Sequence, residues 1–207
     1  MRKSWNRFKH KNLGIAATVI ALALLPIILI STQQKQEDRS HAQAATTLSF
    51  SPVTTSSTPL LKKVGDNFPL NVVISPGTNL VSFLKLEVLY DPSKVTLSQT
   101  NPVVVNSAAF SQIIEGPVYS TGKVQIAISI GADRSKAIST VSNALTLNFV
   151  AVSSSNLTNV SFGSNSAAYS IATTDAVGEN VLSTTLPAYL KISKVAGKPS
   201  GGGGKKH

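Results

Sequence analysis

The chain has 207 residues, enough for one ordinary domain with flanking segments, and it contains no cysteine, which excludes disulfide bonds and thiolate metal sites. Its net charge of +10 lies mostly at the ends: residues 1–45 carry seven basic and two acidic side chains, residues 46–193 eight and seven, and residues 194–207 four and none. The central part is therefore nearly neutral and lacks the clustered cations that phosphate binding requires, which argues against nucleic-acid binding.

The N-terminal segment has the pattern of a membrane signal. A basic tip, residues 1–12, precedes an uncharged apolar run, residues 13–30, which as a helix would be about 27 Å long and just long enough to cross a bilayer. The basic flank predicts a cytoplasmic N-terminus and export of the chain beyond residue 30. We expect an uncleaved signal anchor in the cell membrane, because the small-x-small site at residues 42–44 lies beyond a polar stretch. Cleavage is the alternative, favoured by Pro26 near the end of the run.

The exported part changes character at residue 46. Residues 31–45 are polar and typical of a stalk, and residues 194–207 have the composition of a flexible linker. Between them, short runs alternate apolar and polar residues and are separated by Gly, Pro, Ser and Asn. Strands are expected over residues 47–50, 68–74, 81–90, 95–98, 124–130, 145–151, 160–162 and 186–192. The pattern predicts an all-β, antiparallel sandwich or barrel of about eight or nine strands, with the Pro69 strand at an edge.

The segment from residue 81 to residue 95, VSFLKLEVLYDPSKV, alternates most strictly. Its core face carries Leu84, Leu86, Val88 and Tyr90. The opposite face is more apolar than solvation requires, and we expect it to dock an exported protein partner together with the outward residues of the strand over 124–130. The predicted partner-binding residues are Phe83, Lys85, Glu87, Leu89, Gln125, Ala127 and Ser129.

Catalysis is not expected in residues 46–193. All three histidines, at positions 10, 41 and 207, lie outside this part, which removes histidine-dependent nucleophilic catalysis and histidine metal sites. The acids stand mostly in apparent turns, so we expect no enzyme and no cofactor. Asp91 and Pro92 are assigned a structural role, because proline ends a strand ladder and the preceding aspartate can accept turn hydrogen bonds. Calcium binding by Asp91 would need more oxygen ligands than any Asp-rich loop here supplies.

Two further functions stay open. Exposed aromatic rings stack on sugars, so polysaccharide binding through Tyr119, Tyr169 and Tyr189 is an alternative to protein recognition. These tyrosines are scattered rather than spaced as a row, and the predicted domain has no tryptophan. The third possibility is a purely structural spacer of a surface layer or adhesin.

The order of the motifs over residues 46–193 resembles a cohesin domain. A Val-Gly-Asp turn leads into FPLNVVI, followed by LYDPSKV, GKVQIAISI and ALTLNFVAV. The resemblance implies a nine-stranded jelly-roll sandwich, similar to cellulose-binding modules, and a dockerin-like partner. In well-known cohesins an Asn-x-Asp pair on the exposed face contacts the dockerin, whereas the corresponding positions here hold Phe83 and Lys85.

Overall fold

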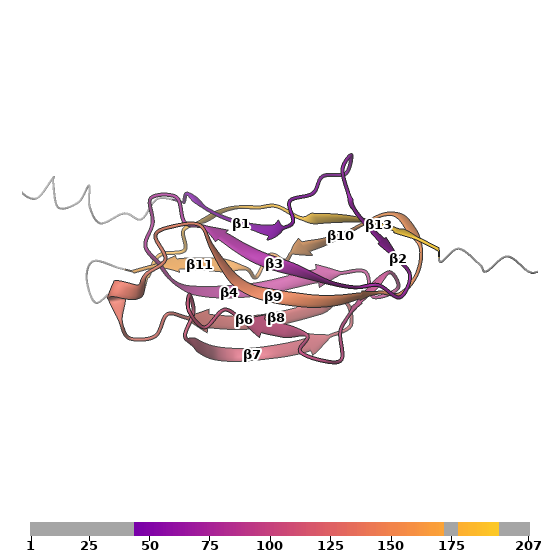
Figure 1. Cartoon of the computed structure of the whole chain (residues 1–207). Helices are drawn as coiled ribbons and strands as arrows, with labels where there is room; N and C mark the ends of the chain where they lie inside the picture. The colour runs from indigo at the N-terminus through magenta and orange to yellow at the C-terminus, as the bar shows by residue number, and fades with distance from the viewer. Residues whose placement is uncertain (1–43, 172–177, 195–207) are drawn as a thin grey trace, which may run out of the picture. The chain divides into compact units, whose positions relative to one another are not determined.

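Two β-sheets, packed face to face, form the part of the chain that the structure describes (Figure 1). The structure is a computed structural model and describes residues 44–171 and 178–194. In chain order its elements are β1 (Thr46–Ser51), β2 (Leu60–Lys63), β3 (Asn67–Ser75), β4 (Val81–Tyr90), β5 (Val95–Leu97), β6 (Val103–Val105), β7 (Gln112–Ser120), β8 (Lys123–Ser129), the 3-10 helix η1 (Arg134–Lys136), β9 (Ser142–Ala151), β10 (Ser155–Phe162), β11 (Ala167–Ser170), β12 (Leu182–Thr185) and β13 (Ala188–Ser193).

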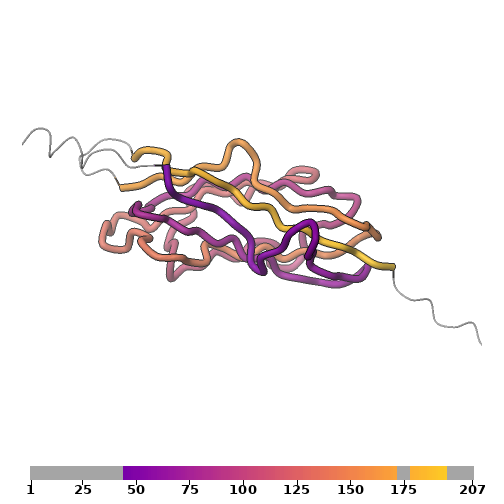
Figure 2. Tube along the Cα trace, turned by 90° about the horizontal axis from the view of Figure 1, so that it is seen from above, coloured from indigo at the N-terminus to yellow at the C-terminus, as the bar shows by residue number. Residues whose placement is uncertain are grey.

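The sheet order places the first strands of the described chain beside the last ones. The first sheet runs β12-β1-β3-β9-β5, with β6 also paired to β9, and the second runs β2-β13-β10-β4-β8-β7, with β11 also paired to β4. All pairs are antiparallel except β1 with β12 and β2 with β13. Figure 2 shows the indigo strand β1 and the yellow C-terminal segment running alongside each other. The all-β antiparallel sandwich predicted from alternation is confirmed.

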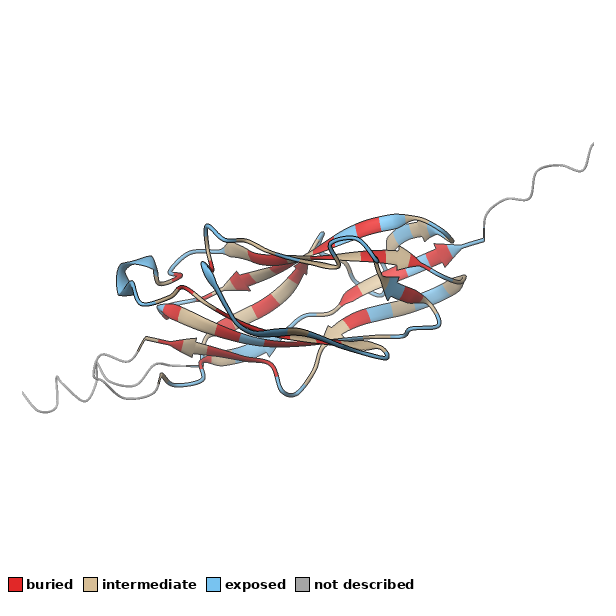
Figure 3. Ribbon diagram, turned by 90° about the horizontal axis from the view of Figure 1, so that it is seen from below, coloured by how far each residue is buried: buried red, intermediate tan, exposed pale blue. Residues whose placement is uncertain are grey.

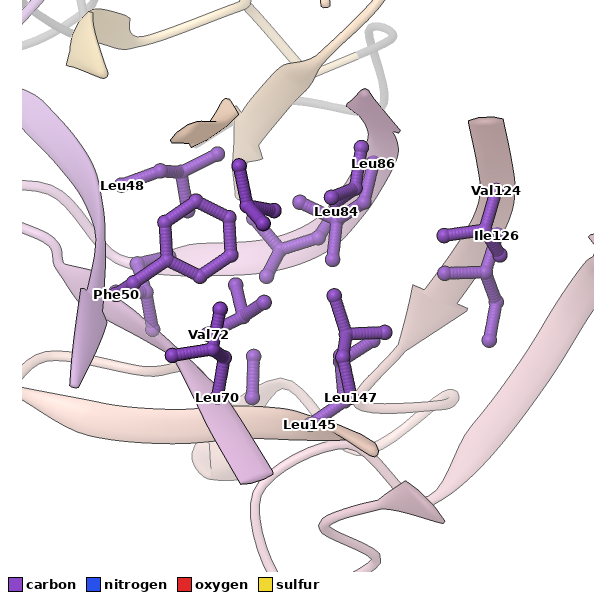
Figure 4. Packing of buried hydrophobic residues seen from close by; sticks show 14 of the residues in the cluster. Leu48, Phe50, Leu70, Val72, Leu84, Leu86, Val124, Ile126, Leu145 and Leu147 are labelled. Carbon is purple, nitrogen blue, oxygen red and sulfur yellow. The ribbon is translucent and has the colours of Figure 1, made fainter. Parts of the chain in front are cut away.

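The core forms where the apolar faces of the two sheets meet. Burial alternates along β1, β3 and β9, as the banding of Figure 3 shows, because successive side chains of a strand point to opposite sides. Leucines, valines and isoleucines from both sheets interdigitate (Figure 4). Two aromatic contacts join the sheets: Phe50 stacks on Phe162 at 4.4 Å between ring centroids, and Tyr90 and Phe149 form a T-shaped contact at 5.3 Å. Burial of this apolar surface is the main stabilising term of the domain.

The described residues contain thirteen strands, more than the eight or nine expected. The unexpected ones are β2, β6, β7, β11 and β12. Four of them are only three or four residues long, too short for alternation to stand out. Strand β7 is long, but eight of its nine residues are exposed, so no apolar-polar alternation marks it in the sequence.

The position of Pro69 corrects a second expectation. Strand β3 lies between β1 and β9 and is not an edge strand. Strand β1, however, pairs only with the segment Asn71–Ser75 of β3, so the half that contains Pro69 has a ladder on the β9 side alone. The missing N–H of Pro69 is tolerated because that half of β3 is locally an edge.

The predicted anchor and tail fall outside the described residues. Residues 13–30 and 195–207 are not among them, and no helix within 44–171 and 178–194 has the length and hydrophobicity needed to cross a bilayer.

Truncation of a core leucine tests the assignment of faces on β4. Leu84 is fully buried, whereas Leu61 on β2 is 70% exposed. We expect Leu84→Ala to lower the free energy of unfolding by about 2–5 kcal/mol and Leu61→Ala by less than about 0.5 kcal/mol. Urea unfolding of the full chain measures both. Equal effects of the two changes would contradict the assignment of Leu84 to the core face of β4.

Candidate partner-binding face

The seven predicted partner-binding residues lie on one face of the second sheet. In an antiparallel pair, opposed residues point to the same side. The register of β4 and β8 pairs Phe83 with Ser129, Lys85 with Ala127, Glu87 with Gln125, and Leu89 with Lys123. We call this surface the β4–β8 face. Figure 1 shows the two strands side by side, with β7 beyond β8.

Exposure divides these residues into two groups. Lys85 and Leu89 are exposed, and Phe83, Gln125 and Ser129 are partly exposed. Glu87 and Ala127 are only 5% and 4% exposed, so the expectation that both present surface to a partner is wrong. The short Ala127 side chain lies between the longer side chains of Lys85 and Glu115 on the neighbouring strands.

The carboxylate of Glu87 is buried within a polar network. Its Oε1 accepts hydrogen bonds from Gln125 Nε2 and Asn165 Nδ2, both at 3.1 Å, and lies 3.6 Å from Lys123 Nζ. Its Oε2 accepts from the Asn165 N–H at 3.2 Å. A buried charge is costly unless it is paired and hydrogen-bonded, and this network meets both conditions.

The segment Gly163–Ser166 that covers Glu87 interrupts what would otherwise be one long strand. Strands β10 and β11 both pair with β4, on either side of Glu87. At the gap the Gly163 N–H donates to the Glu87 carbonyl at 2.7 Å, and Ser166 Oγ accepts from the Glu87 N–H at 3.1 Å. A Cβ on Gly163 would overlap the Glu87 carboxylate, so glycine is needed for this close approach.

The network sets the protonation state of Glu87. The hydrogen bond from the Asn165 side chain is the largest influence and lowers the pKa of Glu87; burial acts the other way, and the Asn165 N–H and Lys123 add to the lowering. The carboxylate is therefore ionised at neutral pH, and Lys123 balances its charge.

A cleft opens at the end of the β4–β8 face where β4 meets β11. Phe83 and Tyr169 are opposed across these strands, with ring centroids 5.6 Å apart and planes tilted by 59°. The cleft has a volume of about 500 Å³, and its lining also includes Lys85, Ile130 and Arg134.

The three tyrosines of the polysaccharide alternative do not form a platform. Tyr169 and Tyr189 belong to β11 and β13, whereas Tyr119 lies on β7 opposite the buried Val124 and so points toward the core side of the sheet. Only Tyr169 lines the cleft. A flat stack of sugar rings on all three is not possible in this arrangement.

Asp91 and Pro92 lie in the turn that follows β4. Asp91 Oδ1 accepts the Ser93 N–H at 2.8 Å, and the Asp91 carbonyl accepts from the N–H groups of Lys94 and Val95, both at 3.0 Å. Hydrogen bonds from Ser93 lower the pKa of Asp91. Within residues 44–171 and 178–194 no three carboxylate or histidine side chains are grouped closely enough to hold a metal ion.

Sequence reasoning missed the side chains that reach the face from other elements. Lys123 stands at the start of β8, Asn165 in the covering segment, and Arg134 in η1. Lys123 lies two residues before Gln125, so the two-residue repeat of a strand could have assigned it to the same face. Nothing in the sequence indicates that Asn165 or Arg134 lies beside it.

Comparison with solved structures identifies the fold. The sequence matches no family model and no curated protein at a significant level. A cohesin from Clostridium acetobutylicum, solved in solution, superposes with a TM-score of 0.56 and 16% identity over 71% of this chain and 91% of its own. The sandwich has the cohesin fold.

Two other cohesins extend this relationship. The cohesin of a type I cohesin–dockerin complex from Clostridium thermocellum matches with a TM-score of 0.57 and 12% identity, over 75% of this chain and 97% of its own. A non-cellulosomal cohesin from the archaeon Archaeoglobus fulgidus matches with a TM-score of 0.53 and 17% identity, over 71% of this chain and 90% of its own. The described residues therefore adopt the fold that the motif order predicted. We call this sandwich the cohesin-like domain.

The Glu87 network predicts a specific response of stability to acid. Because the pKa of folded Glu87 is lowered, its stabilising contribution is present above the unfolded pKa of about 4.3 and is lost as the pH falls through the folded pKa. We expect Glu87→Gln to lower the free energy of unfolding by about 1–3 kcal/mol at pH 7, with the difference from wild type shrinking toward pH 3. Urea unfolding at a series of pH values measures this. Glu115→Gln, an exposed change on β7, is the control, and a constant difference at all pH values would contradict the network.

Proposed function

We propose that the cohesin-like domain is a non-catalytic module that binds an exported protein partner of dockerin type through the β4–β8 face. The observation that carries this proposal is the cleft-bearing outer sheet face, with a partly exposed aromatic pair and an exposed lysine, on a cohesin fold. A cohesin in the Clostridium thermocellum complex is bound to a dockerin, which supports a partner of the same kind here.

The physical character of the face suits close docking of a protein. Ser129, opposite Phe83, is partly exposed and has a short side chain, so a partner could approach closely at this end of the face. Phe83 is a suitable apolar anchor, because aromatic residues that become buried in an interface often carry a large share of the binding free energy.

We further propose that the domain is displayed at the cell surface. Residues 13–30 would form a single membrane-spanning anchor, with residues 1–12 in the cytoplasm and residues 31–45 as a stalk. Tethering would keep a captured partner near the cell.

Loss of the aromatic anchor tests partner binding. Phe83 lies on the outer side of the sheet and contacts Tyr169, so Phe83→Asp should leave the core intact. We expect the variant to fail to retain the protein that the wild-type full chain captures from culture supernatant. Circular dichroism checks its folding, and Phe83→Leu, which keeps an apolar side chain, should retain part of the binding. Capture by both variants at wild-type levels would refute the role of this face.

A cellulose-binding assay distinguishes protein recognition from sugar binding. Retention of the chain on insoluble cellulose, abolished by Tyr169→Ala or Tyr189→Ala, would favour the polysaccharide alternative. Absence of any retained protein or glycan would favour a structural spacer.

The anchor has its own test. If residues 13–30 remain in the mature protein, it should fractionate with membranes and keep its N-terminal sequence, as read by mass spectrometry. A mature chain that begins after residue 44 would show cleavage instead.

A further inference from the structure

The cleft at the β4–β11 end of the face has an uneven balance of charge. One of its lining side chains, Lys85, is an exposed cation, and no carboxylate side chain lines the cleft among the described residues. Clefts lined by one sign of charge favour ligands of the other sign. The cleft therefore has the electrostatic character of an anion acceptor.

Lys85 makes no ion pair with the described acidic residues of its own face. It is exposed, and no ion pair involving it is found within residues 44–171 and 178–194. Its cross-strand neighbours on both sides are the alanines Ala127 and Ala167. The nearest acid along its strand face, Glu87, is already engaged by Lys123 and Asn165. Glu115 shares a second, smaller cavity of about 160 Å³ with Lys85 but makes no ion pair with it.

An apolar wall borders this cation. Phe83 precedes Lys85 by one strand period and contacts Tyr169, and both rings line the cleft together with Ile130. Because the planes of the two rings are tilted by 59°, they form an angled apolar wall rather than one flat platform for a sugar ring. The site thus joins a positive charge to an apolar wall within about 500 Å³.

We propose that this cleft receives an acidic side chain of the partner, aspartate or glutamate, with an apolar residue beside it. The carboxylate would lie at Lys85 and the apolar side chain against Phe83 and Tyr169. A protein source is favoured because the cleft continues into the β4–β8 face, which offers further area for a partner surface. This inference rests on the proposed function for its biological meaning, and its chemistry can be tested separately.

Two blocked tripeptides provide the direct test: acetyl-Leu-Glu-Phe-amide and its neutral counterpart acetyl-Leu-Gln-Phe-amide. Each is titrated into the isotope-labelled full chain in detergent micelles, and backbone amide shifts are followed by nuclear magnetic resonance. We expect the glutamate peptide to shift the amides around Phe83, Lys85 and Tyr169 and to bind at least about threefold tighter than the glutamine peptide. Higher salt should reduce that difference, because screening weakens exposed ionic contacts.

Charge variants locate the effect. Lys85→Gln should remove the preference for the glutamate peptide, whereas Lys191→Gln, an exposed lysine on β13 of the same sheet, should leave it unchanged. Equal binding of the two peptides, or a preference that survives Lys85→Gln, overturns the inference. Tighter occupation of the same amides by a galacturonate oligosaccharide than by the glutamate peptide also overturns it, in favour of an acidic glycan.

The captured partner supplies the second readout. Lys85→Glu should weaken its binding by about tenfold and reverse the salt dependence, with Lys191→Glu changing it less than about twofold. If the wild type captures no partner while the glutamate peptide still binds the cleft, the proposed function fails and the cleft chemistry stands. If a partner is captured with equal affinity by wild type and Lys85→Glu, the cleft inference fails and the proposed function stands.

Discussion

The need to neutralise one buried carboxylate shapes the outer face of the second sheet. Glu87 lies in the middle of β4, on the side away from the core, yet it is almost completely buried. Its charge is compatible with that position only because Lys123, Gln125 and Asn165 surround it. To bring Asn165 there, the chain leaves the ladder between β10 and β11 and folds over β4. The network therefore determines where the sheet surface is closed and where it remains open.

The covered region around Glu87 and the exposed region around Lys85 differ in how their charges are balanced. Around Glu87 the charges are paired within the domain, and this region stabilises the covering segment. One strand period away, Lys85 is exposed and borders the cleft. A residue whose charge is satisfied internally offers little to a ligand, whereas an exposed cation beside aromatic rings can gain new contacts on binding. The recognition chemistry that we propose is thus concentrated at the β4–β11 end.

The relationship to cohesins illustrates how little identity a sandwich requires. The three cohesin structures described above share 12–17% of their residues with this chain, yet the two-sheet arrangement is retained. Alternation, turn residues and adequate core volume suffice for the fold, and many side-chain combinations meet those conditions. Binding specificity depends instead on individual side chains, in our proposal Phe83 and Lys85, so a shared fold does not transfer a shared ligand.

The sequence by itself determined the all-β class and the two faces of β4, because a strand with one buried face must repeat its apolar residues every two positions. It also identified Phe83 and Lys85 as outward residues. Only the tertiary structure decided that Glu87 is covered and that Tyr169 and Arg134 border the same cleft. Local periodicity specifies which side of its own strand a residue faces. It carries no information about which distant segment will lie above that side, since this depends on sheet order and on the path of the loops.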